Sequence, residues 1–168
     1  MVDLGSNSVR LVIFEGLSRN PLPIFNEKAV LGLGRGLQQT GRLNAEAIEP
    51  ALTVLGRYAA VANAMSADPV EILATAATRD AENGPDFIAA INRRLPDIPI
   101  HVLSGSEEGA LSAEGVLLGF PGADGVLGDM GGGSLELVEL DHGRMGQAAS
   151  LPLGALRLAD RANGDPAR

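Results

Sequence analysis

The chain has 168 residues, of which 45% are hydrophobic, and a formal net charge of −8. This charge argues against nucleic acid and against an anionic membrane surface as partners, because both would be repelled. The chain has no cysteine, which excludes disulfides and Cys-ligated zinc and fits a cytoplasmic location. Any phosphate-rich ligand would have to be attracted by local donors or by a metal ion.

The first part of the chain predicts an antiparallel meander. Residues 9–17 are β-branched and aliphatic with little polar interruption, which is typical of a buried strand. Residues 18–23 are typical of a turn, and residues 24–37 indicate one or two further strands that run into a glycine-rich bend.

A helix is expected over residues 45–65. Asn44 is suited to be its N-cap, and an apolar stripe at helical spacing extends from Ile48 to Ala62. Pro50 removes an amide from the second turn, which predicts a late start or a kink.

The middle of the chain alternates between predicted strands and helices. Residues 70–80 form an apolar run of strand length that becomes polar at Thr78, and residues 84–95 form a short amphipathic helix. Residues 98–104 indicate the next strand, and residues 105–120 indicate a helix with two glutamates in its first turn. This alternation predicts an α/β fold whose later strands are parallel.

The end of the chain repeats its beginning. Residues 125–154 predict strand, glycine turn, strand, turn and strand, and "GDMGGGSLELVELDHG" matches "VDLGSNSVRLVIFEG" in its order of Asp, apolar residue, Gly, Ser and apolar strand. An internal repeat of this kind predicts two lobes of the same fold. We place the first lobe at residues 1–121 and an incomplete second lobe at residues 122–168.

Each copy of the repeat contains a turn that suits a phosphate. Successive backbone N–H groups in a Gly/Ser turn form an anion-binding nest, and the lack of side chains lets a phosphate approach closely. Asp3 and Asp129 each come directly before such a turn, and a carboxylate can act on a phosphate through Mg²⁺. Either turn alone is better explained by a tight hairpin. Its recurrence at matching points favours two nests that grip successive phosphates.

Four segments in order resemble one family. They are "VDLGSNSVRLVI", "TAATRDAENGPDFI", "VLSGSEEGALSAEGV" and "LGDMGGGSLELV", and together they are similar to the exopolyphosphatase / guanosine pentaphosphate phosphohydrolase family. That family has paired ribonuclease-H-like lobes, as do actin, Hsp70 and the sugar kinases. The resemblance implies a hydrolase that releases terminal phosphate from polyphosphate or guanosine pentaphosphate.

The resemblance also assigns roles to residues of this chain. Glu108 matches the catalytic glutamate, and Arg79 matches an arginine of the same centre. Glu136 matches an acidic residue implicated in metal binding, and the chemistry of Asp129 and Asp3 suits them to hold Mg²⁺ together with it. The phosphate-binding positions are Gly5, Ser6, Asn7 and Ser8 in the first loop and Gly131, Gly132, Gly133 and Ser134 in the second.

The chemistry of these residue types fits phosphoanhydride hydrolysis. Glu108 could orient and deprotonate a water, and Arg79, expected at the end of a strand, could contact phosphate. Each has a simpler alternative. Glu107 and Glu108 would both suit a helix N-terminus, Arg79 could form a surface ion pair with Asp80, and Glu136 could lie on the solvated face of a strand.

Two other functions compete with the hydrolase. One is an ATP-dependent relative of the sugar kinases, and the other is a noncatalytic binder of polyphosphate or of guanosine tetra- and pentaphosphate. Both ends of the sequence resemble cut ends, so we expect a fragment of a longer parent protein. The resemblance further allows a homodimer formed through the C-terminal part of that parent.

Overall fold

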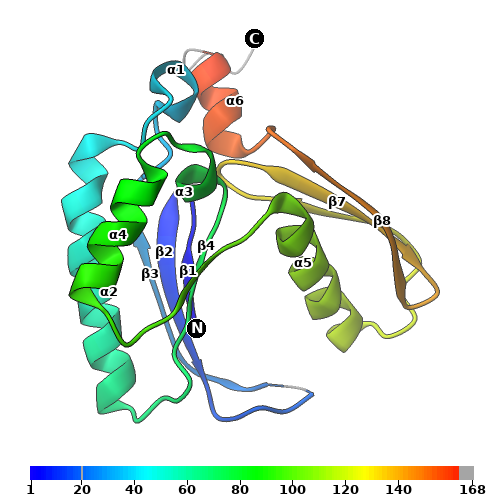
Figure 1. Ribbon diagram of the computed structural model, residues 1–168. Helices are drawn as coiled ribbons and strands as arrows, with labels where there is room; N and C mark the ends of the chain where they lie inside the picture. Colours follow the sequence, from blue (N-terminus) through cyan, green and yellow to red (C-terminus); the bar gives the residue numbers. More distant parts are fainter. Residues whose placement is uncertain (20, 163–168) are drawn as a thin grey trace.

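The computed structural model describes residues 1–19 and 21–162, in which the strands form two separate sheets (Figure 1). The strands are β1 (Val2–Leu4), β2 (Ser8–Phe14), β3 (Pro23–Val30), β4 (Ile72–Ala74), β5 (Ile100–Val102), β6 (Gly125–Met130), β7 (Leu135–Asp141) and β8 (Arg144–Leu151). The helices are α1 (Leu37–Thr40), α2 (Ala45–Ala64), α3 (Ala76–Asp80), α4 (Gly84–Arg94), α5 (Gly105–Gly119) and α6 (Ala155–Arg161).

The first sheet has five strands in the order β3-β2-β1-β4-β5. Strands β1, β2 and β3 pair antiparallel, whereas β4 is parallel to β1 and β5 is parallel to β4. The predicted opening meander and the parallel second half are both confirmed. Because β1 and β4 are parallel and adjacent, the chain segments that follow them emerge at the same edge of the sheet.

Helices α2 and α4 cover one face of the first sheet (Figure 1). Asn44 caps α2 by accepting a hydrogen bond from the backbone N–H of Glu46 at 3.2 Å. The helix begins at Ala45, so the late start expected from Pro50 does not occur. Burial of the apolar face of α2, which includes Leu55 and outweighs the lost hydrogen bond, explains this difference.

The segment before Arg79 differs from the prediction. The strand ends at Ala74, and Ala76–Asp80 form the short helix α3, so Arg79 lies in a helix and not at the end of a strand. An apolar run of this length suits either structure, and the alanines tip the balance towards a helix.

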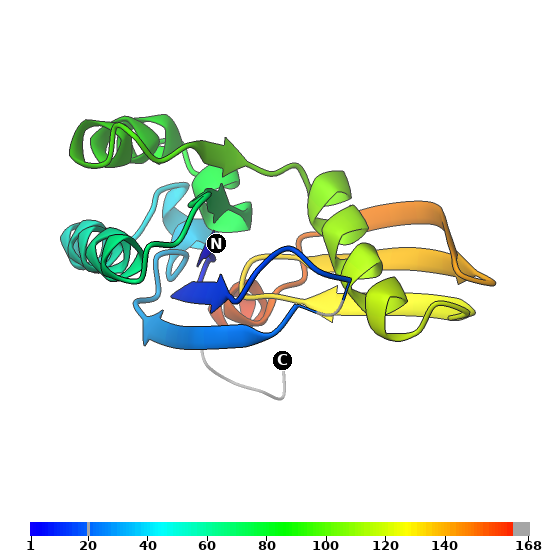
Figure 2. The same ribbon diagram turned by 90° about the horizontal axis from the view of Figure 1, so that it is seen from below.

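The second sheet is an antiparallel meander in the order β6-β7-β8. Helix α5 packs on this sheet (Figure 2). The side chain of Ala113 is buried against Val138 and Leu140. Helix and sheet are so close here that a Cβ at Gly109 would lie only 3.1 Å from Val138 Cγ2. None of the helices in residues 1–19 and 21–162 is long and apolar enough to cross a membrane.

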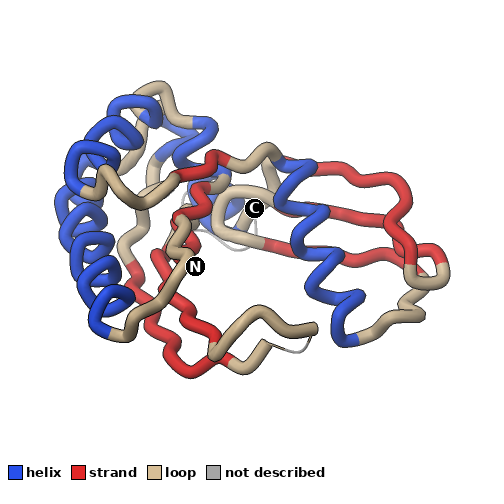
Figure 3. Tube along the Cα trace, turned by 60° about the horizontal axis from the view of Figure 1, so that its bottom comes forward, coloured by secondary structure: helices blue, strands red, loops and turns tan. Residues whose placement is uncertain are grey.

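The two sheets meet at one end, where α6 returns towards the first sheet (Figures 1 and 3). The backbone N–H of Gly36 donates to Asp160 Oδ2 at 3.0 Å, and Gln39 Nε2 donates to the carbonyl of Asp160 at 3.0 Å. These contacts tie α6 to α1. They hold the two sheets together at the end of the molecule where both glycine turns lie.

Candidate functional site

A cavity of about 500 Å³ lies between the two sheets and is lined by both glycine turns. The sequence-predicted residues that line it are Asp3, Gly5, Ser6, Asn7, Ser8, Glu108, Asp129, Gly131, Gly132, Gly133, Ser134 and Glu136. The fold therefore brings together twelve of the thirteen predicted residues. The thirteenth, Arg79, does not line the cavity but forms an ion pair with Glu108.

The first turn joins β1 to β2 and is fixed by its own backbone. Gly5 N–H donates to the carbonyl of Ser8 at 3.0 Å, and Gly34 N–H donates to the carbonyl of Ser6 at 2.8 Å. The Ser6 hydroxyl accepts from the N–H of Ala77 at 3.2 Å, which attaches the turn to the start of α3. Ser6 is thus a buried and structurally anchored member of the cavity wall.

The second turn joins β6 to β7 and is held from behind by α6. Gly131 N–H donates to the carbonyl of Ser134 at 3.0 Å. The N–H groups of Ala155 and Leu156 donate to the carbonyls of Gly131 and Gly132 at 3.0 and 2.9 Å. In a trans peptide the C=O and the following N–H point in opposite directions, so the N–H groups of Gly132 and Gly133 point away from α6.

The glycines of the second turn also let the two turns touch. A Cβ at Gly133 would lie 2.5 Å from Ser6 Oγ and 2.8 Å from Ala76 Cβ, and a Cβ at Gly132 would lie 3.2 Å from Ser6 Cβ. Any side chain at Gly133 would push the turns apart. The bare backbone therefore has a packing role between the sheets in addition to any role towards a ligand.

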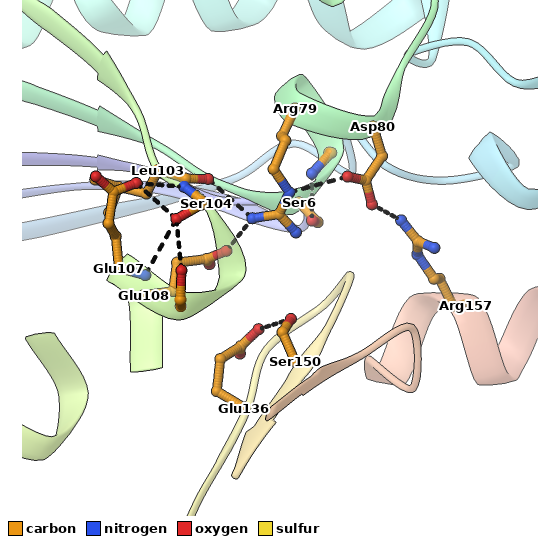
Figure 4. Close-up of polar contacts among 12 residues, drawn as sticks. Ser6, Arg79, Asp80, Leu103, Ser104, Glu107, Glu108, Glu136, Ser150 and Arg157 are labelled. Atoms are coloured by element: carbon orange, nitrogen blue, oxygen red, sulfur yellow. Dashed lines mark hydrogen bonds and ion pairs between the residues drawn. The ribbon is translucent and has the colours of Figure 1, made fainter. Parts of the chain in front are cut away.

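Glu108 and Arg79 form an ion pair at the cavity wall (Figure 4). Arg79 Nη1 donates to Glu108 Oε2 and to the carbonyl of Leu103, the latter at 2.9 Å. Burial raises the pKa of the Glu108 carboxyl, as do the nearby Glu136 and Asp3, while Arg79 opposes the shift. Burial disfavours the charged guanidinium, yet the bonds to Glu108 and Asp80 prevail and raise the pKa of Arg79.

The two adjacent glutamates of α5 have different surroundings. Glu107 forms a capping box with Ser104, whose hydroxyl accepts from the N–H of Glu107 at 3.3 Å while Glu107 Oε2 accepts from the N–H of Ser104 at 2.7 Å. These bonds from Ser104 lower the pKa of Glu107. The helix-terminus alternative therefore explains Glu107, whereas Glu108 lines the cavity.

Three further carboxylates line the same cavity. Asp129 and Glu136 lie opposite each other on β6 and β7, and Ser150 continues this row on β8. Glu136 is 3% exposed and accepts from Ser150 Oγ at 2.8 Å, so the solvated-face alternative for it is wrong. Glu136 shares the α5-facing side of the strand with Val138, because side chains two residues apart point to the same face.

Asp3 faces this row from the first sheet. Burial raises the pKa of its carboxyl, Arg10 opposes the shift, and the negative charge of Asp129 adds to it. Asp129 in turn accepts a hydrogen bond from Ser112 Oγ. Neighbouring carboxylates thus disfavour the ionised forms of Asp3 and Glu108, which is the electrostatic condition that a bound cation relieves.

The carboxylates of the cavity are not assembled into a ready cluster of ligands. Among residues 1–19 and 21–162, the group of three acidic or His side chains with ligand atoms within 4.8 Å of one another is Asp124, Asp141 and His142. That group is exposed and lies outside the cavity. The predicted ligands Asp3, Asp129 and Glu136 would have to bind a metal with waters or phosphate oxygens completing its coordination, as is usual for Mg²⁺.

Several residues of the site were not predicted from the sequence. Leu111 and Ser112 line the cavity, and their spacing of three and four residues from Glu108 on a helix could have indicated the shared face. Ser150 and Arg157 reach the site only through tertiary packing. No pattern in the sequence marks them.

Two strand–turn–strand units, one in each sheet, thus line one cavity of an α/β protein. The Ppx/GppA phosphatase family model matches residues 12–166, and the chain belongs to this family. The family resemblance and the α/β fold class inferred from the sequence are therefore confirmed.

Curated relatives and solved structures support the same conclusion. The chain is 36% identical to exopolyphosphatase 2 of Mycobacterium tuberculosis over 170 residues, which are 95% of this chain and 53% of that protein. A crystal structure of an exopolyphosphatase from Cytophaga hutchinsonii superposes with a TM-score of 0.86 at 29% identity, covering 95% of this chain and 52% of that one. The Ppx/GppA family member from Aquifex aeolicus superposes with a TM-score of 0.79 at 28% identity, with the same coverages.

More distant structures share the fold alone. The PilM–PilN type IV pilus biogenesis complex contains a chain that superposes with a TM-score of 0.61 at 12% identity. The present chain spans about half the length of the curated relatives that it matches.

Proposed function

We propose that this chain carries the catalytic centre of a hydrolase that releases terminal phosphate from inorganic polyphosphate, from guanosine pentaphosphate, or from both. The observation that carries the proposal is that both glycine turns and Glu108 line one cavity. The family and the exopolyphosphatase relatives support the substrate class.

The two turns bind the phosphates. The N–H groups of Gly132 and Gly133 point away from α6 and the turn of Gly5–Ser8 faces them, so adjacent phosphates of one polyanion can contact both turns. With a net charge of −8, the protein attracts such a ligand only through these local donors and a cation. The turns therefore position the phosphates and stabilise their negative charge, the two effects that dominate catalysis of phosphoryl transfer.

Glu108 is the base that activates the attacking water. Its carboxylate lines the cavity, and Arg79 holds Oε2 while the guanidinium is itself anchored to the carbonyl of Leu103. Oε1 has no part in this ion pair and can accept a proton from a water in the cavity. A raised pKa brings Glu108 closer to the operating pH of a general base.

Asp3, Asp129 and Glu136 are the residues that would hold Mg²⁺. They come from β1, β6 and β7 and line one cavity, and burial together with the charge of Asp129 raises the pKa of Asp3. When bound, Mg²⁺ supplies charge neutralisation on the phosphate oxygens. The chain's own part is to present oxygen ligands beside the turns that hold those phosphates.

The test measures phosphate release from polyphosphate, guanosine pentaphosphate and ATP with Mg²⁺, for the wild-type chain and for Glu108→Gln. We expect polyphosphate turnover to fall by about 10²–10⁴-fold in the variant, the usual contribution of general base catalysis. Glu107→Gln is the matched control, since Gln also completes a capping box and Glu107 does not line the cavity. Its turnover should equal that of the wild type.

The other outcomes separate the competing functions. ATP turnover that survives Glu108→Gln would favour a relative of the sugar kinases. Tight polyphosphate binding without turnover would favour a noncatalytic binder. The lobe boundary between residues 121 and 122, the homodimer and the cytoplasmic location remain predictions.

A further inference from the structure

A row of four alternating charges connects the cavity to α6 (Figure 4). Glu108 pairs with Arg79, Arg79 Nε donates to Asp80 Oδ1 at 3.0 Å, and Asp80 Oδ2 accepts from Arg157 Nη2. Asp80 thus joins two arginines through its two oxygens. The guanidinium plane of Arg79 is fixed from both sides, by Glu108 and Asp80.

The outer member of this row is not an ordinary surface arginine. The Arg157 side chain is only 14% exposed, and its Nε is buried without a hydrogen-bond partner among the described residues. A buried unsatisfied donor is unfavourable, and a surface ion pair would leave it in water. The pair with Asp80 is therefore partly desolvated and less screened than an exposed pair.

Helix α6 links Arg157 to the second glycine turn. Two residues before Arg157, the N–H of Ala155 donates to the carbonyl of Gly131. Gly154 packs directly on the backbone of this turn, since a Cβ there would lie 2.4 Å from Gly133 N. Any displacement of the turn therefore moves α6, and with it Arg157.

We propose that Asp80 and Arg157 are positioning residues that couple the second glycine turn to Glu108. Arg157 holds Asp80, Asp80 holds Arg79 at Nε, and Arg79 orients the carboxylate of Glu108. The glutamate is then correctly aimed only when the second turn is in place. The catalytic consequence rests on the proposed function, whereas the coupling of Arg157 to Arg79 does not.

The direct test follows the Nε–H group of Arg79 by NMR, with its resonance assigned from Arg79→Lys. In the full 168-residue chain, Arg157→Gln should accelerate hydrogen exchange at Arg79 Nε several-fold, although residue 157 does not touch Arg79 in the network described. Arg161→Gln is the matched control, because Arg161 is an exposed arginine on the same helix. An unchanged exchange rate in Arg157→Gln would overturn the proposal.

A charge-reversed pair separates positioning from mere stabilisation, and it serves if Arg157→Gln fails to fold. Asp80→Arg with Arg157→Asp restores an ion pair between α3 and α6, but it leaves Arg79 without its acceptor and beside a like charge. We expect a melting temperature near that of the wild type together with fast exchange at Arg79 Nε. Slow exchange in this double variant would show that Asp80 does not hold Arg79.

Steady-state kinetics give the second readout. The double variant should lower kcat for phosphate release from polyphosphate by about 10–100-fold, as expected for a misplaced catalytic group, with KM nearly unchanged. A rise in KM alone would contradict a positioning role. If Glu108→Gln keeps wild-type turnover, the proposed function fails, and the exchange at Arg79 still decides the coupling.

Discussion

The two sheets of the chain contain the same strand–turn–strand unit in very different settings. The first sheet is covered by α2 and α4 over a large core, whereas the second has a small core made by Ala113, Val138 and Leu140. Both sheets expose large apolar side chains, such as Val30 in the first sheet at 66% and Val126 in the second at 73%. The first unit therefore rests on its own core, while the second depends on α5, α6 and the contact between the turns.

The two turns differ in the same way. The first is anchored inside its own sheet and to α3, and Ser6 contributes a side chain to that anchor. The second consists of bare backbone pressed against the first and is held from behind by Ala155 and Leu156. The first copy of the motif is thus held by contacts within its own sheet and with α3, whereas the second is held by contacts with the first turn and with α6.

The largest expected effect concerns this difference in cores. Leu55→Ala in α2 should lower the free energy of unfolding by about 2–5 kcal/mol, because it leaves a cavity in the large core. Leu140→Ala, the same change in the small core, should lower amide-exchange protection in β6, β7, β8 and α5 only. Equal loss of protection in the first sheet would mean that the two sheets unfold as one unit.

A change at the contact between the turns should have the next largest effect. Gly133→Ala places a methyl group 2.5 Å from Ser6 Oγ, so the turns must separate and the affinity for inorganic triphosphate with Mg²⁺ should fall. Gly115→Ala is the control, because nothing lies within 4 Å of a Cβ at this position and Gly115 does not line the cavity. Calorimetric titration measures both, and equal affinities in the two variants would refute the packing role of Gly133.

The smallest expected effect is on the pH dependence of stability. Folding raises the pKa of Glu108, so the folded chain holds this proton more tightly than the unfolded chain and loses stability as pH rises through the raised value. Glu108→Gln removes this loss. The stability of the variant relative to wild type should therefore increase from acidic to neutral pH in urea unfolding, and a constant difference would contradict the raised pKa.

The two glycine turns are predictable from the sequence because the pattern that marks them is local. Asp, Gly and Ser recur at fixed spacing before an apolar strand, and this pattern can be recognised without knowing how the chain packs. The α/β class followed from the alternation of strands and helices in the same way. Both features depend on residues that are neighbours in the chain.

The features of the site that the sequence does not predict depend on the tertiary fold. The run before Arg79 suits a strand as well as a helix, so the sequence alone does not show that β4 ends at Ala74 and that Arg79 lies in α3. The partners of Glu136 and Asp80, which are Ser150 and Arg157, come from segments that pack against them only in the folded chain.

An NMR titration of the isotope-labelled chain tests whether both turns bind one polyanion. Inorganic triphosphate is added with Mg²⁺ while the amide resonances of Gly5–Ser8 and Gly131–Ser134 are followed. Binding of one polyanion by both turns should shift both sets of resonances together, with a single dissociation constant. Shifts in one turn only, or two different dissociation constants, would contradict it.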